Sequence, residues 1–353
     1  MKLYKVQLND LINGCIMIYR SILRFILIFL SLTCVVKSHC NENEVLNENV
    51  IICGVCKNIE NAALNTIVNV ERLGARFNDY VVILYENNST DRTVEILMNW
   101  ANENHHIIFI TEMLSDEELL SFSSARAWNN APCRMELIAR ARNIVLEEAL
   151  DKQYDDYPYL IMADLDFMCD WPIDEIIRSI KIDSPWDVIF ANGVGRSCNV
   201  WDRFALRNSQ YPLGSELLGN LWWEQLGNSP LKMPQSLGLV PVYSAFGGLG
   251  IYKRECIGNA RYSGLVTPEL ERLYRYIFSQ CSLDNPQLQD YLNFIGIPHT
   301  DSDEIPVIWI KSSGYDMPVC CEHLPFHASI FNNGFRNFYI NAKMAMRYNF
   351  FCE

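Results

Sequence analysis

Short apolar runs alternate with amphipathic stretches along the first half of the chain, and this alternation predicts both strands and helices. Runs typical of buried strands lie at 50–55, 80–85, 107–110 and 159–163. Stretches with apolar residues at helical spacing separate them, at 62–73, after the polar loop 86–93 as far as Trp100, and at 134–150. Strands that alternate with helices favour an α/β fold with a mostly parallel, doubly wound sheet and helices on both faces.

The second half of the chain carries weaker signals of the same kind. We expect a short helix at 174–181 and strands at 186–191, 242–252 and 306–310, the second of these strands broken by glycines. The segment 211–238 reads as an aromatic insertion, in which core packing of Trp222 and Trp223 is favoured over stacking on a sugar. No proline- or serine-rich linker lies within 50–350, so one domain over residues 50–353 is the simplest organisation.

Residues 1–40 differ in character from the rest of the chain. The run 25–36 is uncharged, follows four basic residues and precedes three glutamates. This pattern is typical of a secretory signal, and the run is short for a membrane span of about 20 residues. A cleaved signal peptide and an uncleaved single-pass (type II) anchor both fit, with 41–49 as a polar linker. Either one places the domain in the ER or Golgi lumen or outside the cell, and a buried helix of a cytosolic protein is the alternative.

Charge and cysteine content narrow the function classes. The net charge of -13 and the absence of a basic stripe argue against binding to nucleic acid by phosphate neutralisation. The chain has 13 cysteines, of which Cys15 and Cys34 lie in the N-terminal segment. An oxidising compartment permits some disulfides, but the pairing cannot be deduced from the sequence.

Two aspartates, Asp164 and Asp166, follow the apolar strand at 159–163. Ligands of an open α/β sheet bind outside the carboxyl ends of its strands. Residues i and i+2 of an extended chain point to the same side, so the two carboxylates can share one hard divalent cation that also takes phosphate oxygens. The pattern therefore predicts a site for a nucleotide diphosphate, and a solvated turn after a core strand is the alternative.

The loop 86–93 is a second candidate binding element. Glu86 stands at the carboxyl end of a predicted strand, where a carboxylate can accept hydrogen bonds from a ribose or a base edge. Ser89 and Asp91 precede a helix and suit its N-cap, so a plain capped loop explains them equally well. Overlapping glycosylation sequons begin at Asn87 and Asn88, and both should be unused if the loop lines a site.

Two arginines lie on the helix predicted before the Asp-x-Asp strand. Arg140 and Arg142 diverge by about 200° around a helix, so only one of them can face a ligand. The planar guanidinium of that one suits phosphate oxygens. A solvated charged face is the alternative for either residue.

Two later segments complete the candidates. Pro325 between His323 and His327 argues against a regular helix there, so we expect one of the histidines to reach the cation or a diphosphate oxygen, unless both are structural. Glu322 could contact an acceptor hydroxyl. The glycines of 244–250, which include two adjacent ones, let the backbone come close to a ligand.

Taken in order, these motifs resemble a known family. The segments 51–60, 86–93, 140–143, 164–166, 244–252 and 321–327 look like those of the fungal capsule-type α-mannosyltransferases and their viral and microbial relatives. More broadly, they are similar to nucleotide-sugar glycosyltransferases of the GT-A fold. The resemblance covers about residues 50–345 and implies that 50–353 is a GT-A catalytic domain. It also fits an N-terminal anchor with a lumenal domain, including that of a viral enzyme acting in host membranes.

The resemblance implies a role for each candidate. Asp164 and Asp166 would be catalytic and would bind Mn²⁺ or Mg²⁺ and the donor diphosphate, with His323 or His327 completing the metal shell. Glu322 would face the acceptor. The resemblance also implies a set of donor-binding residues, namely Glu86, Asp91, Arg142, Asp164, Gly247 and Gly248.

The implied reaction is transfer of a hexose, mannose favoured, from GDP-mannose or a UDP-hexose to a hydroxyl of a glycan or glycoconjugate. Two rival interpretations remain at this point. One is a catalytically inactive relative that binds a sugar nucleotide or a glycan. The other is a metal-dependent phosphohydrolase, which usually needs two metals about 3.5–4 Å apart and more ligands than the single carboxylate pair seen here.

Overall fold

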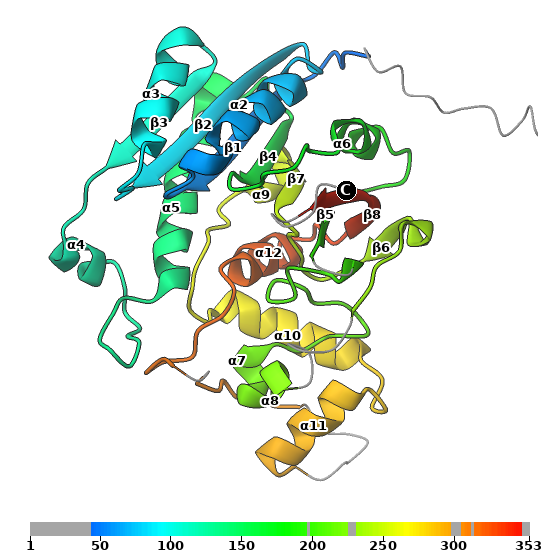
Figure 1. Cartoon of the computed structure of the whole chain (residues 1–353). Helices are drawn as coiled ribbons and strands as arrows, with labels where there is room; N and C mark the ends of the chain where they lie inside the picture. Colours follow the sequence, from blue (N-terminus) through cyan, green and yellow to red (C-terminus); the bar gives the residue numbers. More distant parts are fainter. Residues whose placement is uncertain (1–43, 196–197, 225–230, 298–304, 312–313, 348–353) are drawn as a thin grey trace, which may run out of the picture. The chain divides into compact units, whose positions relative to one another are not determined.

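A single mixed sheet organises the part of the chain that the computed structural model describes, namely residues 44–195, 198–224, 231–297, 305–311 and 314–347. Its strands follow the order β3-β2-β1-β4-β7-β5-β8-β6 (Figure 1). They are β1 (Asn49–Cys56), β2 (Asp79–Asn87), β3 (Ile107–Glu112), β4 (Tyr159–Asp164), β5 (Val188–Val194), β6 (Leu239–Pro241), β7 (Leu249–Lys253) and β8 (Phe338–Arg347). The predicted segment 1–40 lies outside the described residues, and no helix within them is long and apolar enough to cross a membrane.

Most neighbouring strands are parallel. The pairs β3–β2, β2–β1, β1–β4 and β5–β8 are parallel, whereas β7 runs antiparallel to both β4 and β5, and β6 antiparallel to β8. This confirms the predicted α/β class with a mostly parallel sheet. The strand predicted at 242–252 corresponds in part to β7, but its antiparallel direction was not predicted. This direction matters for the site because the first residue of β7, Leu249, pairs with Ala163 near the end of β4.

Helices pack on both faces of the first four strands. Ile51, Cys53, Ile83 and Tyr85 point to the face that α5 covers, and the alternate residues point to the face that α2 covers. The described helices are α2 (Glu60–Gly74), α3 (Thr93–Glu103), α4 (Asp116–Ser121), α5 (Arg134–Ala149), α6 (Ile173–Ile180), α7 (Ser215–Leu218), α8 (Asn220–Trp222), α9 (Arg254–Ile257), α10 (Pro268–Gln280), α11 (Pro286–Ile295) and α12 (His323–Asn332).

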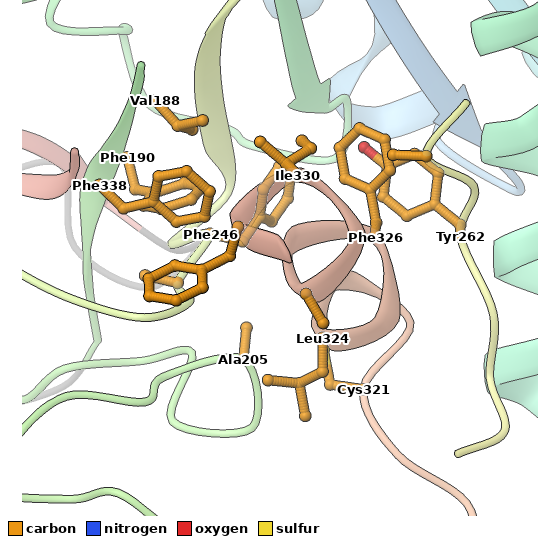
Figure 2. Close-up of a cluster of buried hydrophobic side chains, with 14 of the residues drawn as sticks. Val188, Phe190, Ala205, Phe246, Tyr262, Cys321, Leu324, Phe326, Ile330 and Phe338 are labelled. Carbon is orange, nitrogen blue, oxygen red and sulfur yellow. The ribbon is translucent and has the colours of Figure 1, made fainter. Parts of the chain in front are cut away.

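Helix α12 is central to the core beneath the second half of the sheet. Figure 2 shows its side chains Leu324, Phe326 and Ile330 among aromatic and aliphatic groups from several other elements. Phe190 of β5 and Phe338 of β8 lie in the same cluster. The cluster fixes the start of α12, where two of the candidate site residues lie.

Two sequence predictions about local structure were wrong. Pro325 does not prevent a helix, because α12 begins at His323 and places this proline in its first turn, where backbone N–H groups have no intrahelical partner. The predicted strand at 306–310 is not a strand in the described part, 305–311. Its backbone bonds instead to the Tyr291 hydroxyl and to the Glu216 carbonyl.

The described cysteines are mostly free. Cys169 is disulfide-bonded, while the described free thiols are those of Cys53, Cys56, Cys133, Cys198, Cys256, Cys281, Cys320 and Cys321. Trp222 is buried, as predicted for core packing, whereas Trp223 keeps 47% of its surface exposed.

Candidate functional site

Asp164 lies at the last residue of β4, at the carboxyl end of the parallel strands. Its backbone N–H donates to the Gly248 carbonyl at 2.9 Å, so the turn before β7 fixes its main chain. Its side chain is 33% exposed, and Oδ1 accepts a hydrogen bond from Arg142 Nη2 at 2.8 Å. The second carboxylate oxygen has no hydrogen-bond partner within the described residues, so it is available to a ligand.

Three further carboxylates surround Asp164. The charges of Asp166, Asp202 and Glu322 all act on it. Burial raises the pKa of Asp164 most, Arg142 lowers it, and these three carboxylates raise it again, to about 7. Four carboxylates and one guanidinium therefore share a small volume, which is an environment that attracts a cation.

Asp202 was not predicted from the sequence. It follows the carboxyl end of β5, and its two carboxylate oxygens accept hydrogen bonds from the backbone N–H groups of Ala205 and Gly247, both at 3.2 Å. Burial, followed by the charge of Glu322, raises its pKa. The rule that pointed to Asp164, a carboxylate at a strand end, could not have identified Asp202, because Asp202 lies eight residues after the last residue of β5.

Arg142 lies at the centre of the cluster. It comes from α5, is buried, and donates through Nη1 to Glu322 as well as through Nη2 to Asp164. Nη1 also contacts His323 Nε2. The guanidinium lies over the rings of Phe246 and Tyr262, with its central carbon 4.8 Å and 5.8 Å from the ring centroids.

Glu322 and His323 therefore both contact Arg142 Nη1. The side chain of Glu322 is only 9% exposed and pairs with Arg142, so a contact with an acceptor hydroxyl would compete with this pairing. The His323 ring is buried, stacks on Phe246, and has no hydrogen-bond partner for Nδ1 among the described residues. Burial, followed by the charges of Arg142 and His327, lowers the pKa of His323, so the ring is neutral.

His327 belongs to the core in this arrangement. Its Nδ1 bonds to Ser244 Oγ at 2.8 Å and its Nε2 to the Tyr252 hydroxyl at 2.9 Å. It is fully buried between Phe190 and Tyr252. Both ring nitrogens are engaged, which departs from the expectation of a metal ligand and matches the structural alternative.

The loop 86–93 is held by its own acidic residues. Glu86 is 1% exposed and accepts hydrogen bonds from the Ser89 N–H at 2.6 Å and the Thr111 hydroxyl at 2.7 Å. Asp91 accepts from the N–H groups of Glu60 and Thr93, which open α2 and α3. These contacts match the alternative of a capped loop, and a nucleoside contact by Glu86 would compete with them.

Gly247 and Gly248 form the tight turn beside Asp164, where the Gly247 backbone lies against the Ala191 backbone and Gly248 against the Phe167 ring. Both have positive φ, +64° and +91°. A Cβ on Gly247 would lie 2.3 Å from the Ala191 carbonyl oxygen, and one on Gly248 would lie 2.2 Å from the Phe167 ring. The glycines are thus required by the turn that fixes Asp164, whether or not a ligand also approaches them.

The two arginines of α5 point to different surroundings, as their helical spacing predicts. Arg140 bonds to Tyr85 and Glu112 and lies over the Phe122 ring, 4.1 Å from its centroid. Arg142 points to Asp164 instead. Among the described residues, no group of three or more His, Cys, Asp or Glu side chains is arranged to hold a metal ion.

Comparison with known proteins gives structural neighbours only. No family model and no curated protein matches the chain. Similar solved structures include the mannosyltransferase PcManGT from Pyrobaculum calidifontis in complex with GDP-Man and Mn²⁺, at 14% identity over 60% of this chain and a TM-score of 0.34. They also include TarS from S. aureus, at 12% identity over 76% of this chain and a TM-score of 0.32.

A third neighbour is glucosyl-3-phosphoglycerate synthase from Mycobacterium tuberculosis in complex with Mn²⁺, UDP and phosphoglyceric acid. It matches at 14% identity and a TM-score of 0.34, over 77% of this chain and 90% of that one. The chain spans 46% of PcManGT and 59% of the TarS structure. At these identities and TM-scores, the neighbours do not define the reaction of this chain.

Proposed function

We propose that this chain is a metal-dependent glycosyltransferase that moves a hexose from a nucleotide-diphosphate sugar to a hydroxyl of a glycan or glycoconjugate. One observation carries the proposal. Two carboxylates separated by one residue, Asp164 and Asp166, lie at the carboxyl end of β4. They belong to a cluster of four carboxylates in which Asp164 and Glu322 pair with Arg142. This is the edge of the sheet at which open α/β folds bind their ligands.

The residues present fit Mn²⁺ or Mg²⁺. Hard cations of this kind take carboxylate oxygens, and Mg²⁺ is commonly held by one or two carboxylates together with substrate phosphates and water. Asp164 offers its second oxygen, and Asp166 is the other proposed ligand. A cation there would be favoured further because it offsets the mutual repulsion that, together with burial, raises the pKa of Asp164. His327 is left out of the proposed ligand set, because both its ring nitrogens are engaged.

The chemistry that a bound cation supplies here is stabilisation of the negative charge on a departing nucleoside diphosphate. The role of the chain's own residues is to hold the donor diphosphate at the end of β4. Asp202, through Gly247, fixes the turn that hydrogen-bonds the Asp164 backbone. Mannose from GDP-mannose is the favoured donor and a UDP-hexose the second choice, both on the motif resemblance described above.

We also propose that the domain works in the secretory pathway, in the ER or Golgi lumen or outside the cell. The apolar run 25–36 behind a basic flank supports this location. The disulfide at Cys169 supports it too, because disulfides persist in oxidising compartments. If the run is not cleaved, it would anchor the chain to the membrane as a type II protein.

A donor panel tests the proposed function. The full chain, purified in detergent, is incubated with Mn²⁺ and each common nucleotide sugar, and released nucleoside diphosphate is measured with and without EDTA. We expect EDTA-sensitive release from one donor, with GDP-mannose tested first. Release that continues in EDTA, or hydrolysis of simple phosphate esters at the same rate, would reject a metal-dependent transferase.

A further inference from the structure

The position of Asp164 depends on Arg142. The Asp164 carboxylate has one oxygen engaged, through the 2.8 Å contact from Arg142 Nη2 to Oδ1, and the other oxygen remains accessible in a side chain that is 33% exposed. Because a carboxylate is planar, fixing one oxygen also fixes the direction of the other. Arg142 therefore sets the direction in which Asp164 presents its accessible oxygen.

Arg142 is itself held through Nη1 and by packing, while its buried Nε has no hydrogen-bond partner among the described residues. Its side chain is only 5% exposed, and Nη1 is anchored by Glu322, whose side chain is 9% exposed. The rings of Phe246 and Tyr262 flank the guanidinium plane. A rigid cation with two parallel donor directions can hold two carboxylates at once, which the single ammonium of a lysine cannot do with the same geometry.

We propose that Arg142 is a positioning residue that orients Asp164 for the divalent cation, with Glu322 as the anchor that orients Arg142. The inference rests on the proposed function, because it concerns the same carboxylates. It replaces two sequence-based roles, namely donor phosphate binding by Arg142 and acceptor binding by Glu322. Both residues act through Asp164 instead.

Arg142 has two opposing effects on the affinity for Mn²⁺, and because they can be separated by substitution, the inference can be tested. The positive charge repels Mn²⁺, so loss of the charge alone would tighten Mn²⁺ binding. Loss of the orientation would weaken it, since removing a group that orients a metal ligand typically costs about tenfold or more in affinity. The variant Arg142→Lys keeps the charge and loses the two-pronged geometry, so it separates the two effects.

The experiment is an EPR titration of Mn²⁺ alone into the full chain, in which the signal of the free ion reports binding. We expect Arg142→Lys to raise the Kd for Mn²⁺ about tenfold or more while the chain stays folded by circular dichroism. The matched control is Arg140→Lys, two residues earlier on α5, where the arginine pairs with Glu112 and Tyr85. We expect this control to bind Mn²⁺ within twofold of wild type.

Each other outcome has a defined meaning. If the folded Arg142→Lys variant binds Mn²⁺ as tightly as wild type, the positioning role is overturned and the proposed function stands. The same holds if Arg142→Met binds Mn²⁺ more tightly while Arg142→Lys is unchanged. If Arg142→Lys does not fold, Glu322→Asp decides, because it keeps the negative charge and withdraws the carboxylate that anchors Arg142. A threefold or greater rise in Kd supports the role, and an unchanged Kd rejects it. No Mn²⁺ binding by wild type would reject the proposed function itself.

Discussion

The substitution His327→Gln should change how the stability of the protein depends on pH. His327 is fully buried, and its two ring nitrogens bond to Ser244 and Tyr252. Burial, followed by the positive charge of Arg142, lowers its pKa from 6.5 to about 3. The neighbouring His323 is buried as well and has its pKa lowered in the same direction. The folded protein therefore keeps these rings neutral in mild acid, whereas the unfolded chain protonates them.

The magnitude follows from proton linkage. A histidine whose folded pKa lies below its unfolded value contributes stability that is present above pH 6.5 and is lost as the pH falls toward the folded pKa. A difference of about 3.5 between the folded and unfolded pKa values changes the free energy of unfolding by about 5 kcal/mol over the whole pH range. Of this, about 2 kcal/mol is already lost at pH 5.

The assay is urea unfolding of wild type and His327→Gln at pH 7.5 and pH 5.0. At pH 7.5 we expect the variant to be less stable by about 1–3 kcal/mol, because glutamine cannot reproduce both hydrogen bonds. Between the two pH values, wild type should lose about 2 kcal/mol more than the variant. The control is His105→Gln, which replaces an exposed histidine and should follow the wild-type pH dependence.

Equal pH dependence of wild type and His327→Gln would refute the reasoning, because it would mean that His327 does not stay neutral in the fold. The same variant also tests the alternative role of His327 as a metal ligand. We expect its Kd for Mn²⁺ to lie within twofold of wild type. A loss of Mn²⁺ binding in the folded variant would restore the sequence-based assignment.

Three further predictions concern groups that support the site. Glu216→Gln should lower the free energy of unfolding by about 3–5 kcal/mol in urea, since it leaves the fully buried Arg207 without its counter-charge; a cost below about 1 kcal/mol would contradict this. Gly247→Ala should lower the melting temperature more than Gly258→Ala, because an added Cβ meets backbone atoms at 2.3 Å and 2.7 Å in the first case and nothing within 4 Å in the second. Glu86→Gln should lower the free energy of unfolding by about 1–3 kcal/mol by weakening one of the hydrogen bonds from the Ser89 N–H and the Thr111 hydroxyl. A raised KM for the sugar donor at unchanged stability would favour the nucleoside-binding role instead.

The parallel half of the sheet could be predicted from the sequence because its signals are local. Each of the first four strands is a short apolar run, and the stretch that forms α5 before β4 has apolar residues at helical spacing. Both aspartates of the Asp-x-Asp pair could be placed at a strand end for the same reason. The antiparallel β7 could not be predicted in the same way, because strand direction depends on which strands become neighbours and not on the residues of one run.

The partners of the site residues could not be predicted from the sequence. Arg142 and Glu322 are 180 residues apart, and their pairing depends on how α5 and α12 pack. The sequence suggested that Glu322 could contact an acceptor hydroxyl, whereas in the fold its side chain is buried against Arg142. His327 was a candidate ligand because it lies four residues after His323, but its partners Ser244 and Tyr252 reach it only in the fold.

The central claim is that Asp164 and Asp166 hold the cation that makes donor turnover possible. The most direct measurement is Mn²⁺-dependent release of nucleoside diphosphate by wild type and by Asp166→Asn, with folding of both checked by circular dichroism. The account predicts release by wild type that EDTA abolishes, and a folded variant with at least a hundredfold lower rate, on the order of the electrostatic contributions known for such groups. A folded Asp166→Asn protein that turns over the donor at the wild-type rate would contradict it.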